Sequence, residues 1–539
     1  MFNFTEEQKE AIKPQGCMVI TACPGSGKTA VVSEKIRNEL KQLKDYQGVI
    51  AITFTRKASQ ELEHRCRIGG LEIKSSFFGT IDSFCLREII LPFWKHVFEH
   101  LGEDLEPKQD ADLSIDERIL VDENKDVNNI SEANFLELIE TFSKNNIIYF
   151  PTITRLAIHI LKSSISCKNY IKSKYKSIYI DEYQDSSEQQ HIFFNKVVDL
   201  GVTGIAVGDL NQSIYGWRGS SPEYLKELMR SPLFTHRTVT INHRCHPSIY
   251  NYANRILNPT FETLPCKSIN VYHHDIVGTQ RELILCLNKL IPLILKKRPK
   301  LTRSDLAVLV KNNNTLEHIR EHLTVPCRVF SKDSIDNLES KNGQLWSDLL
   351  RFRYNQEILP EQIISALPLT STLKRPEIKR LRNLIKEIRT TPENTLVDKL
   401  ISFGNDIFGK PTDTEIAALK LTVEDREAIK QYYPSSPDEI QCMTIHKSKG
   451  LEFDVVIHLD LYEWILPRLE INENSREPFC PNLEQDLNLH YVALTRAKSI
   501  CVLMWSTQRI NSRGKQVKGE PSRFLKRPGI NGLYKTLNT

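Results

Sequence analysis

The chain has 539 residues, of which 40% are hydrophobic and 26% charged, so it is long enough for several domains that each bury a core. Its net charge of +5 permits contact with nucleic acid without indicating it. No apolar run approaches the roughly 20 residues that span a bilayer. The first residues lack the pattern of a signal peptide, so we expect a cytoplasmic protein without membrane contact. The twelve cysteines include no C-x-x-C pair, which indicates reduced thiols and argues against zinc or iron–sulfur binding.

The segment 18–29 is predicted to be a phosphate-binding loop between a strand and a helix, because residues 30–43 repeat apolar side chains at helical spacing. Glycines let backbone N–H groups point at phosphate oxygens, Lys28 adds positive charge, and the Thr29 hydroxyl can hold Mg²⁺. A chance match is expected in only about 4% of chains this long. The predicted nucleotide-binding residues are Ala22, Cys23, Pro24, Gly25, Ser26, Gly27, Lys28 and Thr29.

Gln8 lies just upstream of this loop, where its amide can offer a donor and an acceptor to an adenine edge. The next strands are predicted at 48–54 and 77–80. The end of the first strand places Phe54 and Arg56 where they can contact a base and a sugar–phosphate backbone. The same pattern also fits an ordinary strand end followed by a solvated helix start.

Residues 96–170 differ in composition and are predicted to form an inserted helical subdomain. Its acidic segment at 103–126 has few aromatic residues and is predicted to be mobile. A basic stretch follows at 162–176. That stretch either faces DNA phosphates or is a solvated helix face.

A strand predicted at 177–180 ends in Asp181 and Glu182. Two carboxylates at the carboxyl end of a strand occupy the ligand position of a doubly wound sheet. We expect Asp181 to hold Mg²⁺ and Glu182 to orient and deprotonate the attacking water. Acidic loops after strands are common, so this interpretation depends on the phosphate loop upstream.

The strand predicted at 204–207 precedes a segment in which an amide and two aromatic residues lie close together. Gln212 could sense the γ-phosphate of a bound nucleotide. Tyr215 and Trp217 stand beside Arg218 and form a stacking platform for single-stranded bases, or else pack as core residues.

Later strands are predicted at 238–241, 306–310, 455–457 and 500–504. Residues 331–437 show helical patterns without an assignable motif. Four further blocks carry the strongest family signal: Asp-Glu-Tyr-Gln-Asp (181–185), Gly-Asp-x-x-Gln-Ser-Ile-Tyr-x-Trp-Arg-Gly (208–219), His-x-x-Lys-Gly-Leu-Glu-Phe (446–453) and Tyr-Val-Ala-x-Thr-Arg-Ala (491–497).

Together these blocks resemble the UvrD/Rep-type superfamily 1A helicases over almost the whole chain. The resemblance implies an α/β fold of two RecA-like P-loop lobes with parallel sheets, each carrying a mostly helical inserted subdomain. The implied division is lobe 1A at 1–95 and 171–236, insertion 1B at 96–170, lobe 2A at 237–330 and 438–539, and insertion 2B at 331–437.

The resemblance also implies an ATP-dependent DNA helicase that moves 3′ to 5′, with ATP and Mg²⁺ between the lobes. Lobe 2A would supply Arg244 and Arg496 as arginine fingers beside Glu182 and Gln212, and Glu452 would contact the ribose. The implied contacts to single-stranded or partly duplex DNA are Phe54, Arg56, Tyr215, Trp217 and His446.

The chain departs from the usual family pattern in a few places. His243 stands where the family has an adenine-stacking Tyr, and Asp82 stands where it has a DNA-contacting His. Both insertions are shorter than in the housekeeping repair helicases, and no nuclease motif follows Arg496. These differences reduce the expected adenine selectivity and leave strand separation by the chain alone an open question.

The short insertions, together with segments 79–84, 88–93 and 173–186, resemble more closely the GajB family, the helicase-like subunits of Gabija anti-phage systems. This resemblance implies a nuclease partner of the GajA kind, an OLD-type ATPase/nuclease, in a bacterial cytoplasm. Two functions remain open. One is an autonomous DNA repair or recombination helicase, and the other is a DNA-sensing regulatory subunit whose ATPase controls the nuclease with little unwinding.

Overall fold

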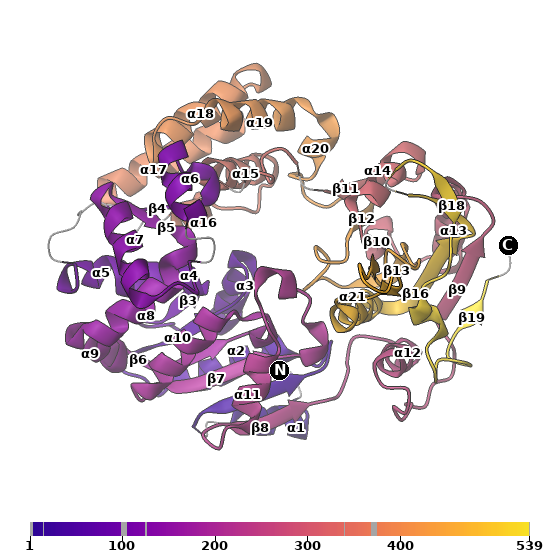
Figure 1. The fold of residues 1–539 in the computed structure, drawn as a ribbon, viewed down its shortest axis with the longest axis horizontal. Coiled ribbons are helices and arrows are strands. Elements are labelled where there is room, and N and C mark those ends of the chain that lie inside the picture. Colours follow the sequence, from indigo (N-terminus) through magenta and orange to yellow (C-terminus); the bar gives the residue numbers. More distant parts are fainter. Residues whose placement is uncertain are drawn as a thin grey trace.

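The computed structural model describes residues 4–13, 16–98, 105–123, 127–331, 333–338, 340–367, 374–511 and 513–537. Two parallel sheets lie toward opposite ends of the longest axis, and helices cover each of them (Figure 1). The α/β fold with two RecA-like lobes is therefore confirmed.

The first sheet has six parallel strands in the order β3-β2-β6-β7-β1-β8. These strands are β1 (Met18–Ala22), β2 (Gly48–Ile52), β3 (Phe77–Gly79), β6 (Tyr175–Ile180), β7 (Thr203–Gly208) and β8 (Thr235–Val239). The helices of this lobe are α1 (Glu6–Ile12), α2 (Lys28–Leu40), α3 (Arg56–Arg67), α10 (Glu188–Asp199) and α11 (Glu223–Arg230).

Alternate residues of these strands face two separate cores. Val19 and Ile50 pack with α10 on one face, whereas Met18, Ile20 and Val49 pack with α2 and α3 on the other. Strands buried on both faces read as continuous apolar runs, which is why the sequence predicts them well. Parallel strands place all their carboxyl ends along one edge of the sheet, where ligands bind in such folds.

The strand predicted at 238–241 lies slightly earlier in the chain, as β8, and its place in the fold differs from the prediction. It pairs with β1 over Thr235–Val239, so it belongs to the first sheet. The division drawn between residues 236 and 237 therefore cuts a strand of the first lobe. The prediction was wrong because β8 is an edge strand with mostly exposed, polar residues, and its membership depends on a partner more than 200 residues away.

The first insertion contains short helices and one small parallel pair of strands. Its elements are α6 (Ile115–Glu123), α7 (Glu132–Lys144), α8 (Ile153–Ser163), α9 (Ile165–Lys174), β4 (Glu106–Lys108) and β5 (Ile147–Tyr149). Helices α4 (Ile81–Phe84) and α5 (Leu91–Phe93) precede it in the chain. Parts of the predicted acidic segment, 103–104 and 124–126, lie outside the described residues. Lys174, in the basic stretch, is paired with the Glu88 carboxylate at 2.7 Å.

The second sheet has seven parallel strands in the order β11-β12-β10-β13-β16-β9-β19. They are β9 (Val271–Ile276), β10 (Leu306–Val310), β11 (Cys327–Phe330), β12 (Ile440–Thr444), β13 (Phe453–His458), β16 (Ala497–Ser506) and β19 (Lys535–Thr536). Helices α12 (Pro247–Leu257) and α21 (Leu483–Thr495) pack on one face, and α13 (Gln280–Lys297) and α14 (Asn313–His322) pack on the other.

The second insertion is helical, as the sequence predicts, and lies at the top of Figure 1. It comprises α15 (Lys341–Tyr354), α16 (Pro360–Ala366), α17 (Arg375–Thr390), α18 (Glu393–Phe408), α19 (Asp413–Glu424) and α20 (Arg426–Lys430). These helices pack around the fully buried Trp346, whose indole N–H donates to the Leu400 carbonyl at 2.8 Å. The insertion thus has a core of its own.

All twelve cysteines lie in described residues, and all are free thiols, as the sequence indicates. Among the helices of the described ranges, none combines the length and apolar character needed to cross a membrane.

Candidate active site between the lobes

The phosphate loop leaves β1 at Ala22 and enters α2 at Lys28. Gly25 and Gly27 have φ angles of +71° and +79°, in the left-handed region that favours glycine. The Ser26 hydroxyl is buried and, within the described residues, has no hydrogen-bond partner. An unpaired buried hydroxyl in a glycine-rich loop at a helix N-terminus fits a phosphate group, whose oxygens would satisfy it.

The segment that follows β8 packs directly on this loop. The side-chain amide of Asn242 donates to the Pro24 carbonyl at 2.7 Å, and the backbone N–H of His243 donates to the Gly25 carbonyl at 2.9 Å. A Cβ atom added to Gly25 would clash with the Cβ atom of Arg244. Arg244 therefore lies against the phosphate loop of the first lobe, and its place there requires glycine at position 25.

Helix α1 holds Gln8 against the same loop. Its amide nitrogen donates to the Ser26 carbonyl at 2.8 Å, and its amide oxygen accepts the N–H of Thr5 at 2.9 Å. The neighbouring Glu7 carboxylate accepts both the N–H and the hydroxyl of Thr240, each at 2.8 Å. Helix α1 thus braces the phosphate loop and the segment after β8 together, and the adenine contact of Gln8 stays a prediction.

Asp181 and Glu182 follow β6 directly, at the carboxyl edge of the sheet. The Lys28 ammonium lies 3.2 Å from a Glu182 carboxylate oxygen. Burial alone would raise the pKa of Glu182, but the ammonium groups of Lys28 and Lys449 outweigh it and lower the pKa to about 2. Burial and the adjacent Glu182 raise the pKa of Asp181 to about 6. Glu182 also has a φ angle of +55°, a sparsely populated conformation that concentrates at functional sites.

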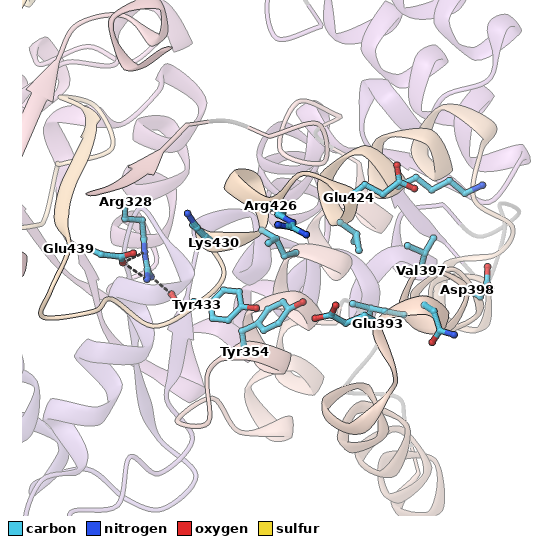
Figure 2. Close-up of a pocket in the computed structure, with 15 residues that line it drawn as sticks. Arg328, Tyr354, Glu393, Val397, Asp398, Glu424, Arg426, Lys430, Tyr433 and Glu439 are labelled. Atoms are coloured by element: carbon cyan, nitrogen blue, oxygen red, sulfur yellow. Dashed lines mark hydrogen bonds and ion pairs between the residues drawn. The ribbon is translucent and has the colours of Figure 1, made fainter. Parts of the chain in front are cut away.

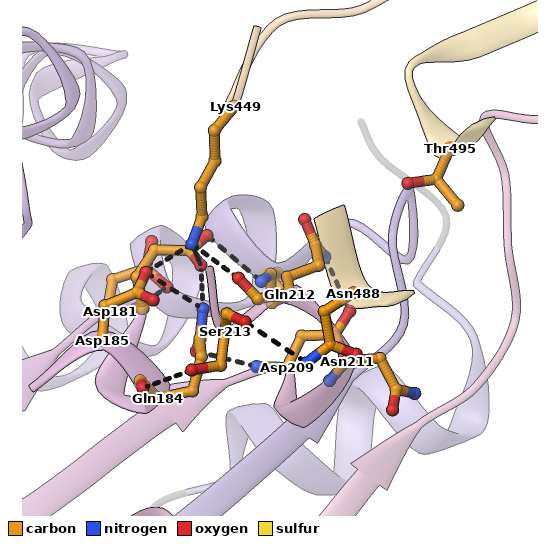
Figure 3. Close-up of polar contacts among 12 residues, drawn as sticks. Asp181, Gln184, Asp185, Asp209, Asn211, Gln212, Ser213, Lys449, Asn488 and Thr495 are labelled. Atoms are coloured by element: carbon orange, nitrogen blue, oxygen red, sulfur yellow. Dashed lines mark hydrogen bonds and ion pairs between the residues drawn. The ribbon is translucent and has the colours of Figure 1, made fainter. Parts of the chain in front are cut away.

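Lys449 crosses from the second lobe to these carboxylates, as Figure 3 shows. Its ammonium bonds the buried Asp185 carboxylate and donates to the Gln212 carbonyl at 2.8 Å. It also lies 3.9 Å from Glu182. Burial raises the pKa of Asp185 to about 6, although Lys449 acts in the opposite direction. Lys449 therefore holds the second lobe against the carboxyl edge of the first sheet.

Arg496 is the other cation that the second lobe presents at this edge. It lies at the end of α21, is only 2% exposed, and donates to the Gln212 side-chain oxygen at 3.0 Å. In the described part of the chain no ion pair joins Arg496 to a carboxylate, and its other partners are neutral oxygens. Burial, reinforced by Arg244, lowers the pKa of Arg496 to about 10. A buried guanidinium without an anion fits a site that receives phosphate.

Gln212 is positioned from the first lobe. Its amide nitrogen donates to Asp209 at 2.6 Å, while Gln184 accepts the backbone N–H of Asp209 at 2.9 Å. Gln184 in turn donates to Glu182 at 2.5 Å. The chain of contacts Glu182–Gln184–Asp209–Gln212–Arg496 thus connects the two lobes.

Glu452 lies on the second lobe but pairs with Arg244, at 2.7 Å, and with Lys498, at 2.9 Å. Arg244 therefore spans the two lobes, with its backbone on the phosphate loop and its guanidinium on Glu452. The ribose contact predicted for Glu452 is not tested by this geometry.

Four of the five predicted DNA contacts gather beside the site. The rings of Phe54 and Tyr215 stack at 5.1 Å between centroids, and the His446 ring lies 5.9 Å from Tyr215. Trp217 is 64% exposed, with the Arg218 guanidinium 4.6 Å from its ring centroid. Burial and nearby cations lower the pKa of His446 to about 4, so it is neutral at physiological pH.

The fifth predicted DNA contact, Arg56, is exposed at the first position of α3, two residues beyond Phe54. No ring contact joins it to the aromatic cluster in the described residues. Exposed aromatic faces beside cations suit stacking of single-stranded bases.

A separate pocket of about 890 Å³ lies between the second insertion and β11 (Figure 2). It contains none of the predicted site residues. The Arg328 guanidinium within it is already paired with Glu439, at 2.7 Å, and bonded to the carbonyls of Tyr433 and Pro434. Because Arg328 is already bonded to protein groups and the lining carries charges of both signs, we interpret this pocket as a packing contact between the insertion and the second lobe.

Comparisons with known proteins agree with this geometry. The UvrD/REP helicase N-terminal domain family matches residues 4–115 and 93–232, and the UvrD-like helicase C-terminal domain family matches residues 339–508. The chain belongs to the UvrD/Rep helicase family. It is therefore an ATP-hydrolysing enzyme of a family of ATP-dependent DNA helicases, which bind DNA and use ATP with a divalent metal.

Individual relatives cover nearly the whole chain. Gabija protein GajB of Bacillus cereus (strain VD045) is 28% identical over 519 residues, spanning 93% of this chain and 95% of the relative. ATP-dependent DNA helicase Rep of Buchnera aphidicola subsp. Schizaphis graminum (strain Sg) is 25% identical, spanning 96% and 95%. ATP-dependent DNA helicase PcrA of Staphylococcus aureus (strain Mu50) is 21% identical, spanning 96% and 85%.

Sequence reasoning missed several residues of the UvrD/Rep-type site. Lys449, Gln184 and Asp209 lie within the recognised blocks but had no assigned role. For Lys449 the sequence did offer a signal, because this lysine lies in the same recognised block as His446 (446–453). The contacts of Gln184 depend on the three-dimensional path of the loops and leave no mark in the sequence.

We predict that Gly25→Ala weakens ATP binding by about tenfold or more. A left-handed backbone costs a residue with a Cβ atom about 1–2 kcal/mol, and the added Cβ would also displace Arg244 from the loop. Titration with a fluorescent ATP analogue measures the loss.

Gly201→Ala is the matched control for this substitution. Gly201 has a φ of +91° but nothing within 4 Å of an added Cβ, so it tests backbone strain without the clash. We expect it to lower stability and leave ATP affinity unchanged. Equal losses of affinity in both variants would contradict the role given to the Gly25–Arg244 contact.

Proposed function

We propose that this enzyme is a DNA translocase that hydrolyses ATP in the interface between its two lobes and moves 3′ to 5′ along single-stranded DNA. The observation that carries this proposal is the buried Arg496 guanidinium, which bonds Gln212 of the other lobe and meets no anionic partner among the described residues. We divide the chain as the sequence predicts, with the first lobe extended through Val239 to include β8.

Glu182 is the proposed base of the reaction. In this structure its carboxylate is paired with Lys28, which lowers its pKa. Phosphates in the loop would compete for the Lys28 ammonium, and the pKa of Glu182 would then rise, because one of its two cations is withdrawn. A higher pKa makes the carboxylate a better acceptor for the proton of the attacking water.

Thr29 and Asp181 are the proposed ligands of Mg²⁺, since a hydroxyl and a carboxylate are hard oxygen donors that this ion prefers. The bound ion would offset the negative charge of the phosphates. Arg244, Arg496 and Lys449 would contribute further positive charge at the γ-phosphate only when the lobes are together, which couples hydrolysis to lobe closure.

We expect Glu182→Gln to lower kcat for ATP hydrolysis by about 10²–10⁴-fold while ATP still binds, because the amide cannot accept the proton. A coupled phosphate-release assay measures kcat, and nucleotide titration measures binding. Glu188→Gln, on the exposed side of α10, is the matched control and should behave as wild type. Hydrolysis by Glu182→Gln at near the wild-type rate would remove Glu182 from this role.

The proposed DNA track runs over Phe54, Tyr215, Trp217 and His446, with Arg56 at its edge. Trp217 is the most exposed of these aromatic residues and has Arg218 at its ring. Its stacking surface is therefore available to a base in this structure, whereas Tyr215 is already stacked on Phe54.

We expect Trp217→Ala to weaken single-stranded DNA binding by about 5- to 150-fold, since stacking on an aromatic residue is worth about 1–3 kcal/mol per base. Fluorescence anisotropy with a labelled oligonucleotide measures affinity, and DNA stimulation of the ATPase should fall with it. Trp464→Ala removes another partly exposed tryptophan, at 41%, and should leave both values unchanged. Unchanged stimulation in Trp217→Ala would make Trp217 a packing residue.

We further propose that the chain is the helicase-like component of a Gabija-type antiviral system in a bacterial cytoplasm, working with a nuclease of the GajA kind. The supporting observation is the likeness to Gabija protein GajB over nearly the whole length of both chains. The likeness to Rep and PcrA supports the alternative, an autonomous repair helicase.

An affinity purification from the source cells, combined with an unwinding assay of the isolated chain, separates these functions. We expect an OLD-type ATPase/nuclease to co-purify and the isolated chain to unwind a 3′-tailed duplex poorly. Robust unwinding without a co-purifying nuclease would contradict the antiviral proposal and support the autonomous helicase. The ATPase assay of Glu182→Gln is independent of both outcomes.

A further inference from the structure

The outer face of α14 carries a cluster of metal-ligating side chains that the ATPase does not use. His318, Glu321 and His322 occupy positions i, i+3 and i+4 of the helix, the spacing that brings side chains together on one face. One ligand atom from each of the three lies within 4.8 Å of the others. The scattered cysteines argued against zinc, but this cluster uses histidine instead.

The three groups converge on one point. The same Glu321 carboxylate oxygen lies 3.7 Å from Nδ1 of His318 and 3.6 Å from Nε2 of His322. The two imidazole rings are nearly parallel, at 12°, with centroids 6.4 Å apart. Ligands at about 2.0–2.2 Å around a tetrahedral zinc lie about 3.4 Å from one another. Small side-chain rotations are therefore enough to close the site.

Both ends of α14 are fixed by the rest of the lobe. At the start, the buried Asp460 carboxylate accepts the N–H of Lys311 at 2.9 Å and the Thr315 hydroxyl at 2.7 Å. At the end, the side chain of Asn288 donates to the His322 carbonyl at 3.0 Å and accepts the N–H of Thr324 at 2.7 Å. The backbone that carries the three ligands is thus held in place before any ion binds, which lowers the entropic cost of binding.

The local charges favour a cation. The cluster lies in the last turns of α14, where the helix dipole is negative. The nearest cation on the helix, Arg320, is occupied elsewhere, because its guanidinium bonds Glu317 at 3.0 Å and Ser331 at 2.6 Å. Neither interaction uses Glu321, which stays available as the anionic ligand.

We propose that His318, Glu321 and His322 bind one divalent transition-metal ion, of which zinc is the physiological candidate, with water at the fourth position. Imidazole ligands select zinc, copper or nickel over Mg²⁺ and Ca²⁺, which prefer oxygen. The site therefore differs in chemistry from Thr29 and Asp181, and the ions of the two sites do not compete.

A bound ion would tie together the last turn of α14, which Asn288 links to α13. The ion would cross-link side chains on the outer face of the second lobe. It would raise the free energy of unfolding and leave the rate of ATP hydrolysis unchanged. Anything that binds only the folded state stabilises it. Zinc should therefore raise the unfolding temperature of the wild-type chain.

The test is equilibrium dialysis of the full-length, tag-free chain against Zn²⁺, with Co²⁺ as a spectroscopic probe. We expect one high-affinity ion per chain, visible d–d absorption of tetrahedral Co²⁺, and no thiolate charge-transfer band. His318→Ala and His322→Ala should each weaken binding at least about tenfold, because each removes one of three protein ligands. Both variants should abolish the zinc-dependent rise in unfolding temperature.

His64→Ala is the matched control, because His64 is an exposed histidine on another helix, α3. It should bind the ion as wild type does. Binding that survives in the His318→Ala/His322→Ala double variant, or a thiolate band with Co²⁺, would place the ion elsewhere and overturn the proposal. A wild-type chain that binds no Zn²⁺ would also overturn it, whatever the outcome for the ATPase.

Discussion

The guanidinium of Arg496 is buried where the two lobes meet, beside Gln212 of the first lobe. Burying a cation costs several kcal/mol unless an anion compensates it. Within the described ranges, the hydrogen bonds of Arg496 go to neutral oxygens alone. The contact with Gln212 keeps the lobes in register but leaves the charge uncompensated. The lobes can therefore meet without a ligand, but the buried charge of Arg496 is compensated only when an anion binds there.

The other charged side chains at the interface also divide by sign between the two lobes. The first lobe presents Asp181, Glu182 and Asp185 at the carboxyl edge of its sheet, and the second lobe presents Lys449 beside Arg496. Lys28 belongs to the first lobe and neutralises Glu182 from within it. The ion pairs across the interface join Lys449 to Asp185 and Glu182. We expect their strength to vary with what binds the phosphate loop, because an added phosphate competes with the carboxylates for the same cation.

The sequence predicted the parts of this architecture that are locally encoded. Apolar runs mark β1, β6, β7 and β10 because each is buried on both faces, and the phosphate loop is recognisable from its glycines and Lys28. The aromatic cluster was also predictable, although Phe54, Tyr215 and His446 are far apart in the chain. Phe54 and Tyr215 follow β2 and β7 of the first sheet, and the carboxyl ends of parallel strands meet at one edge. His446 follows β12 of the second sheet, and only the family resemblance grouped it with them.

The parts that were missed depend on long-range contacts. Strand β8 is polar and exposed, so only its pairing with β1 shows that it belongs to the first sheet. The contact of Arg244 with the phosphate loop was missed for the same reason, since the segment after β8 packs on that loop. The contacts of Lys449 join residues more than 200 positions apart, and nothing in the local sequence indicates which carboxylate it meets.

Lys449 contacts both the carboxylates at the sheet edge and the aromatic cluster. Its ammonium bonds Asp185 on the nucleotide side and lies 5.0 Å from the Tyr215 ring centroid on the side of the aromatic cluster. A cation held between a carboxylate and an aromatic face cannot move toward a new anion without weakening both contacts. Tyr215 in turn stacks on Phe54, which follows β2 in the same lobe. We therefore expect a change of charge at the phosphate loop to reach the aromatic cluster through the Lys449 ammonium group, without a long pathway between the two sites.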